Sequence, residues 1–161
     1  MREHILHFNN LNVAMAVRYA QGITDELSVR EAIPTLAPPR WQYGHLALVA
    51  QLAGTQVGGK AFLPESWGDL FRGGTRYSPE LVYPSMAELV QAVERAHAMA
   101  GEALAAAMPE ALSAPAPLER LRGRFPKAGD AVAFLLGTHQ GYHLGEVMAW
   151  RKAAGLGVPP A

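Results

Sequence analysis

Two histidines one helical turn apart are the residues of this sequence best suited to chemistry. His139 and His143 have the i, i+4 spacing that places both imidazole rings on one face of a helix. Val132, Leu136 and Trp150 continue the same alternation of three- and four-residue steps, so the pair is predicted to face the interior of a bundle. Burying an unpartnered imidazole costs roughly 1–3 kcal/mol, which a shared metal ion would offset. The pair therefore predicts a metal site.

His45 is the candidate for a third ligand. It lies on the apolar stripe of a shorter helical segment, about residues 41–52, and the preceding Gly44 permits another helix to approach closely. A lone histidine on an apolar face is more often a hydrogen-bonded core residue than a ligand, so spacing alone leaves both interpretations open. Three neutral imidazoles with open positions would suit Zn, Ni, Fe or Mn better than Ca or Mg, which prefer oxygen ligands.

Glu146 lies one turn beyond His143 on the same predicted face. It could be a further metal ligand, an acceptor that fixes an imidazole tautomer, or a catalytic general base acting on bound water. The alternative is a rim carboxylate paired with Arg151 or Lys152. Gln140 occupies the place of the catalytic glutamate in the His-Glu-x-x-His motif, which disfavours peptidase chemistry.

The other histidines and tryptophans are expected to have structural or surface positions. His4 and His7 lie in the first turn of the first predicted helix, where exposure is usual, and His97 has no histidine neighbour. Trp41 and Trp150 are expected to pack around the site, with stacking on a substrate as the alternative for either.

Hydrophobic periodicity predicts an all-α fold with a long irregular crossover between the second and third helices. Ser85 with Glu88 three residues later is a capping-box signal for the start of the third helix. The segment before it contains six glycines and two prolines, with at most a short helix near residues 67–71. The expected elements are helices at about 3–32, 41–52, 85–108 and 128–154, with the crossover at 54–83.

Length and composition indicate one domain over residues 1–161, because 161 residues with 50% apolar content can bury a core. Fourteen basic and fourteen acidic side chains give no net charge, which disfavours nucleic acid and anionic lipid as partners. The absence of cysteine means that any reacting thiol would have to come from a substrate. With neither a signal-peptide pattern nor an apolar run of about 20 residues, the expected location is the cytoplasm and no membrane span is expected.

Two sequence elements resemble the DinB/YfiT-like metalloproteins. The first is Trp41-x-x-Gly44-His45-Leu46 and the second is His139-x-x-x-His143-x-Gly145, in the order and separation of that family. The resemblance spans nearly the whole chain. It implies a four-helix bundle with an up-down-down-up path, usually a homodimer, with His45, His139 and His143 on one divalent transition metal such as nickel or zinc.

The resemblance also implies a class of activity. The family includes thiol S-transferases and isomerases that use low-molecular-weight thiols, so a metal-dependent transferase or hydrolase with a small-molecule substrate is the leading hypothesis. This sequence has Glu146 where glutamine is commoner in the family, which affects the chemistry expected at the open coordination site. The competing hypothesis is a non-catalytic or stress-related bundle that binds a metal or small ligand and in which the metal is structural. A DNA-binding role is disfavoured because no basic patch is evident.

Overall fold

The computed structural model describes residues 1–160 and is built from helices. Within these residues the only β-type pairing is an isolated bridge between Pro115 and Lys127, so the all-α prediction is confirmed. No helix in this range combines the length and apolar character needed to cross a membrane. The elements are α1 (Arg2–Ala20), α2 (Asp25–Ser28), α3 (Pro39–Thr55), α4 (Ser66–Phe71), α5 (Met86–Ala106), α6 (Pro109–Ser113), α7 (Glu119–Arg122), α8 (Ala128–Ala133), the π-helix η1 (Phe134–Thr138) and α9 (His139–Ala153).

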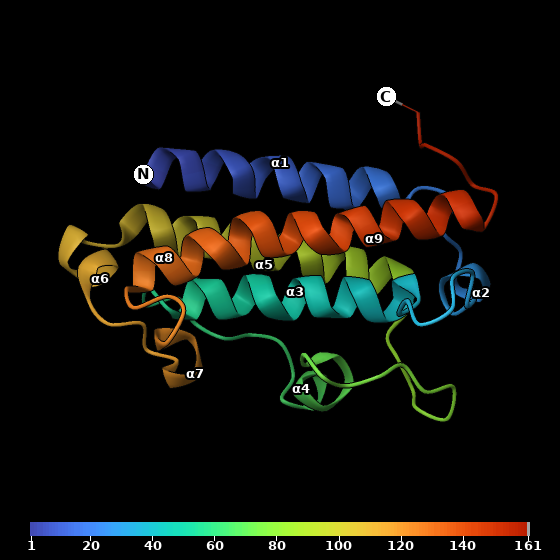
Figure 1. Cartoon of the computed structure of the whole chain (residues 1–161), viewed down its shortest axis with the longest axis horizontal. Helices are drawn as coiled ribbons and strands as arrows, with labels where there is room; N and C mark the ends of the chain where they lie inside the picture. Colours follow the sequence, from blue (N-terminus) through green and yellow to red (C-terminus); the bar gives the residue numbers. More distant parts are fainter. Residues whose placement is uncertain (161) are drawn as a thin grey trace.

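The long helices lie side by side along the longest axis of the molecule (Figure 1). Helices α8, η1 and α9 follow one another without a break and act as one long helix. This helix and α1 run in one direction, whereas α3 and α5 run in the other (Figure 1). The order along the chain is therefore up, down, down, up. It brings α3 beside α9, the two elements that carry the candidate ligands.

Small side chains allow α3 and α5 to pack closely, and this is the largest helix–helix interface of the fold. Ala47, Ala50 and Ala53 of α3 are fully buried, and a Cβ on Gly54 would lie 3.1 Å from the Cα of Ala100 in α5. Such close approach gains many weak dispersion contacts along the interface. Helix α3 is thereby held rigidly at the centre of the bundle.

The first helix is shorter than its sequence pattern predicts, so the expectation of one helix over residues 3–32 is wrong. Helix α1 ends at Ala20, and Gly22 adopts a left-handed backbone conformation with φ of +76°. Thr24 then caps the new helix α2, its hydroxyl oxygen accepting from the backbone N–H of Leu27 at 3.2 Å. The apolar period continues through Leu27 because α2 also packs on the core, and periodicity alone does not reveal the turn.

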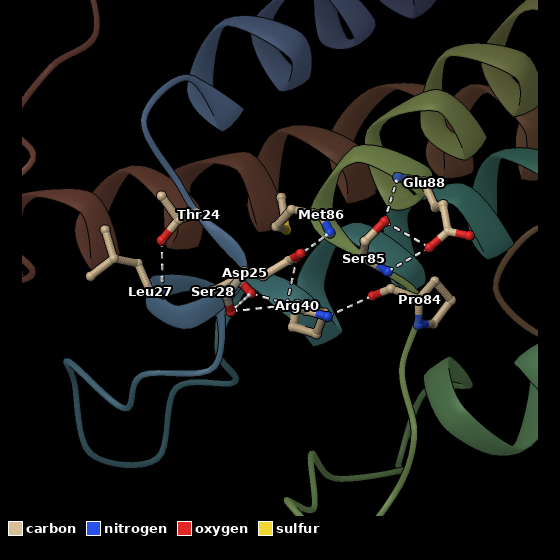
Figure 2. Close-up of polar contacts among 9 residues, drawn as sticks. All are labelled: Thr24, Asp25, Leu27, Ser28, Arg40, Pro84, Ser85, Met86 and Glu88. Carbon is tan, nitrogen blue, oxygen red and sulfur yellow. Dashed lines mark hydrogen bonds and ion pairs between the residues drawn. The ribbon is translucent and has the colours of Figure 1, made fainter.

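Arg40 ties the beginning of α3 to α2 and α5 (Figure 2). Its guanidinium donates to Ser28 Oγ at 2.8 Å, to Asp25 Oδ1 at 2.7 Å and to the Pro84 carbonyl oxygen at 2.8 Å. The same Asp25 oxygen accepts the backbone N–H of Met86 at 2.7 Å. One buried cation therefore fixes three helix ends at the same end of the bundle.

The crossover between α3 and α5 is irregular, as predicted, and contains the short helix α4. It ends where Ser85 and Glu88 form the predicted capping box at the start of α5 (Figure 2). Phe71, at the end of α4, is fully buried against Gly44 of α3, where a Cβ would overlap its ring. The close helix approach expected at Gly44 is made by the short helix α4 of the crossover, through its last residue.

A π-helical turn separates the apolar positions of α8 from those of α9. The most buried side chains of α9 include Gln140, Leu144 and Val147, whereas His139 and His143 are half-buried. The predicted apolar seam through the two histidines is therefore displaced by about one position. The wider five-residue turn of η1 accounts for the shift, because it changes the phase between the helix before it and the helix after it.

Candidate metal centre

His45, His139 and His143 come together between α3 and α9. One nitrogen from each ring lies within 4.8 Å of the others, a spacing that could hold a metal ion. Ring centroids are 5.2 Å apart for His45 and His139, and 4.7 Å apart for each of the other two pairs. The three residues that the sequence singled out thus form one cluster, although 94 positions separate the first from the second.

His45 is buried and its ring orientation is fixed from two sides. Its Nδ1–H donates to the carbonyl oxygen of Phe71 at 2.6 Å, because a carbonyl can only accept. This tautomer leaves the lone pair on Nε2. The ring also stacks on Trp41, with centroids 4.7 Å apart and an interplanar angle of 12°, and the Trp41 indole N–H donates to Thr75 Oγ1 at 3.0 Å. Phe71, which accepts from His45, and Thr75, which accepts from Trp41, both belong to the crossover.

His143 is held by two acceptors. Its Nδ1–H lies 2.7 Å from Gln42 Oε1 and 2.8 Å from Glu146 Oε2, and Gln42 Nε2 donates to the same Glu146 oxygen at 2.9 Å. The three side chains form a closed ring of hydrogen bonds, so the Nε2 of His143 carries the lone pair. Supporting hydrogen bonds of this kind orient metal-binding histidines and raise their basicity.

His139 begins α9 directly after the π-helix. The edge of the Phe134 ring lies against it, with centroids 5.6 Å apart. Its Nδ1 is buried and has no hydrogen-bond partner within residues 1–160. A buried ring nitrogen without a partner is costly, and a cation bound at this Nδ1 would account for it. This orphaned nitrogen, with three imidazoles as the donor set, fits a divalent transition metal.

All three rings favour the neutral form that a metal requires. Burial lowers the pKa of His45 to about 4, against an ordinary value of 6.5, although the Phe71 carbonyl opposes the shift. Burial, reinforced by the two neighbouring histidines, likewise lowers the pKa of His139 to about 4. Burial also lowers the pKa of His143, with Glu146 acting in the opposite direction. At neutral pH the cluster therefore presents lone pairs and no protons to a cation.

A cavity of about 470 Å³ opens beside two of the three histidines. Its walls combine α3, the crossover, the segment around α7, and η1. Gly73 also lines this space beside His45, and a Cβ there would make an ordinary contact with the His45 ring at 3.9 Å. The lining residues are His45, Leu48, Val49, Gln51, Leu52, Thr55, Ala61, Gly68, Arg72, Gly73, Arg120, Leu121, Phe134, Leu135 and His139.

Glu146 lies beside the cluster and not within it. It is absent from the group whose ligand atoms converge, and its carboxylate is engaged by Gln42 and His143. The rim pairing with Arg151 is not formed, since that guanidinium is buried and donates to backbone carbonyl oxygens of α1 and the following turn. The geometry is that of an acceptor fixing an imidazole tautomer, one of the three roles considered from sequence.

The remaining histidines lie apart from the cluster. His4 and His7 are exposed, as predicted. His97 is fully buried in α5, where Asn9 accepts from its Nδ1–H at 2.8 Å and donates to its backbone carbonyl oxygen at 3.2 Å. Trp150 is also buried and donates its indole N–H to the Arg30 carbonyl oxygen at 2.8 Å, so it packs within the bundle.

Sequence reasoning singled out Trp41 and Glu146 but missed the other residues that support the ligands. Gln42 lies three positions before His45, the same helical face, and this spacing was the available signal for its role. The Phe71 carbonyl oxygen and Thr75 carried no signal, because their contacts depend on how the irregular crossover folds. The two arginines of the cavity wall, Arg72 and Arg120, were likewise not singled out.

Comparison with known families agrees with this fold and cluster. The sequence model of the DinB superfamily matches residues 11–147, a span that includes all three histidines and Glu146. No protein with a curated description matches the chain. Because the family match covers well over half of the sequence, the chain belongs to the DinB superfamily.

Proposed function

We propose that His45, His139 and His143 bind one divalent transition metal, with nickel or zinc as the leading candidates and iron or manganese as alternatives. The support is the convergence of three neutral imidazoles, two of them with tautomers fixed by hydrogen bonds and the third with an orphaned nitrogen. Nitrogen donors without carboxylates favour these metals over Ca²⁺ and Mg²⁺.

We further propose that the protein is a metal-dependent enzyme of the thiol S-transferase or hydrolase type. The single observation that carries this is the cavity of about 470 Å³ at His45 and His139, which would give a small molecule access to the site. A bound ion of this kind lowers the pKa of a coordinated water or thiol, which supplies a nucleophile at neutral pH. The chain's own residues would hold the ligands rigid, exclude water along the apolar wall and position the substrate.

The competing function is a non-catalytic bundle in which a metal pins α3 to α9. A structural site normally has a closed shell of four protein ligands. Glu146 is the nearest carboxylate, and its engagement by Gln42 and His143 argues against its completing such a shell. The enzyme is therefore the better-supported proposal.

Elemental analysis of protein purified without an affinity tag tests the metal. We expect about one equivalent in the wild type, little in His143→Ala, and wild-type content in the control His7→Ala, whose side chain is exposed. A wild type without stoichiometric metal under metal-replete conditions would refute the site.

Turnover by the loaded protein tests the activity. Low-molecular-weight thiols would be assayed with electrophilic acceptors, and ester or amide substrates would be assayed without thiol. Activity lost in His143→Ala and kept in His7→Ala would support an enzyme. Full metal occupancy without turnover, together with a large loss of stability on chelation, would favour the structural alternative.

A further inference from the structure

The cavity beside the histidines is lined by charged residues to which the proposed function assigns no role. Its walls are mainly aliphatic and aromatic, from Leu48 and Leu52 of α3 to Leu121 and Phe134 on the opposite side. The lining contains two arginines and no aspartate or glutamate. Most of the cavity wall is therefore apolar, and its only formally charged residues are positive.

The two arginines are available to a ligand. Arg72 lies in the crossover directly after α4, and Arg120 lies in α7, so two separate segments each contribute an arginine to the lining of the same cavity. Both residues are exposed, and neither forms an ion pair within residues 1–160. Elsewhere in the fold the guanidiniums of Arg40 and Arg151 each donate several hydrogen bonds to protein acceptors.

The two uncharged polar side chains of the wall, Gln51 and Thr55, each already form hydrogen bonds within the protein, although no hydrogen bond engages the amide nitrogen of Gln51. The side-chain oxygen of Gln51 accepts two backbone N–H groups of the crossover, at 2.7 and 2.8 Å. The hydroxyl of Thr55 donates to its own helix at 2.8 Å. The guanidiniums are thus the charged donors left to recognise a ligand, and a planar guanidinium matches a carboxylate in geometry as well as in charge.

We propose that this cavity selects organic carboxylates that carry an apolar body. The carboxylate binds Arg72 and Arg120, and the apolar body lies along the aliphatic wall. The placement of a reacting group near His45 and His139 rests on the proposed function, whereas the preference for an apolar acid does not depend on it. The inference thereby narrows the substrate class from any small molecule to an amphipathic acid.

Calorimetric titration with three matched probes tests the inference. The probes are 4-phenylbutyrate, its uncharged amide 4-phenylbutyramide, and acetate, which lacks the apolar body. The dissociation constant for 4-phenylbutyrate is expected to be at least ten-fold lower than for either of the other two. The titrations are done on zinc-loaded protein and on protein stripped with a chelator, because a carboxylate could also bind a metal directly.

Two pairs of variants locate the carboxylate. Arg72→Gln and Arg120→Gln are each expected to weaken binding of 4-phenylbutyrate about three- to ten-fold and to leave binding of the amide unchanged. The matched controls Arg76→Gln and Arg124→Gln remove exposed arginines that do not line the cavity, and they are expected to bind like the wild type. All four changes are on exposed side chains, so circular dichroism should show folded protein.

Three results would overturn the inference: equal affinity for acid and amide, equal losses in the cavity and control variants, or a preference for the acid that disappears on chelation. The last result would place the carboxylate on a metal. Measuring the metal content of the same samples distinguishes a failure of carboxylate binding from a failure of the proposed metal site. Selective acid binding by protein that takes up no metal would refute the proposed metal site and leave the present inference standing.

Discussion

At the scale of single residues, the groups that hydrogen-bond to His45 and His143 say as much about the site as the histidines do. Glu146 and Gln42 together enclose the Nδ1 of His143, so a carboxylate and an amide from two helices define one tautomer. Removing either acceptor would leave the ring held by the other alone and therefore less firmly oriented. The role of Glu146 can therefore be separated experimentally from that of a catalytic base.

Glu146→Ala is expected to weaken metal affinity about ten-fold, because the orientation and basicity of His143 depend on its acceptors. Competition with a chromogenic chelator measures this, with Glu102→Ala, an exposed carboxylate on α5, as the control. Unchanged metal affinity with lost turnover would instead assign Glu146 the role of general base.

His97 makes the stability of the fold depend on pH. Burial lowers its pKa to about 4, from 6.5. Between these values the unfolded chain binds a proton that the folded chain does not, so stability is complete above pH 6.5 and falls as pH drops toward 4. From pH 7.5 to pH 5, this group alone should cost about 2 kcal/mol.

Denaturant unfolding of metal-free protein at the two pH values measures this effect. The non-titrating variant His97→Gln is expected to lose about 2 kcal/mol less than the wild type over the same interval. The difference between the two proteins isolates His97 from the other buried histidines. Identical losses would show that His97 is not held neutral in the folded state.

The residues of the site differed in how far sequence could predict them. Spacing identified His139 and His143 as a pair, because one helical turn is a local relation. His45 is separated from them by most of the chain, and only the family pattern raised it above an ordinary core histidine. Contacts such as that between His45 and the Phe71 carbonyl oxygen depend on a folded crossover, and no local pattern encodes them.

At the scale of elements, the helix boundary marked by a capping box was predicted from the sequence. Boundaries set by tertiary packing were not. The capping box of Ser85 and Glu88 predicted the start of α5. The short helix expected near residues 67–71 is present as α4. The π-helix η1 was missed because a change from four- to five-residue hydrogen bonding leaves no distinct residue pattern. It matters because it ends directly before His139 and sets the phase of α9.

Gly44→Ala tests the contact between α3 and the crossover. A Cβ at this position would overlap the ring of Phe71, which is fully buried and cannot move without repacking. The expected cost is about 2 kcal/mol of unfolding free energy, with weaker metal binding because the Phe71 carbonyl oxygen orients His45. Thermal and denaturant unfolding measure the first effect, and chelator competition measures the second.

Gly68→Ala is the matched control, because it lies in α4 and a Cβ there would meet nothing within 4 Å. It is expected to be neutral or slightly stabilising, since alanine favours a helix. Equal behaviour of the two variants would contradict the proposed dependence of His45 on this contact.

At the scale of the whole molecule, the candidate ligands join helices that are distant in sequence. His45 lies on α3 while the other two lie on α9, so one ion would link the centre of the bundle to its fourth long helix. The buried apolar residues form a single cluster that runs from α1 to α9. One domain over residues 1–161 stays a prediction.

Metal should therefore stabilise the entire fold in one step. At a free metal concentration one hundred times the dissociation constant, the expected gain is about 2.7 kcal/mol. Calorimetry should show one unfolding transition that moves to higher temperature with metal and returns after chelation. Two separate transitions would contradict the single domain, and an unmoved transition would contradict metal binding to the folded state. Homodimer formation, which the resemblance implies, stays a prediction for sedimentation analysis.

The stacking of Trp41 on His45 gives the molecule an optical reporter of its own. An indole 4.7 Å from a ring that accepts a cation has an excited state sensitive to the charge beside it. Titrating a metal into the stripped protein should change the intrinsic fluorescence, and Trp41→Phe should remove that part of the signal while Trp67 and Trp150 continue to emit. Occupancy of the site could thus be followed in real time, without a label, in the native chain.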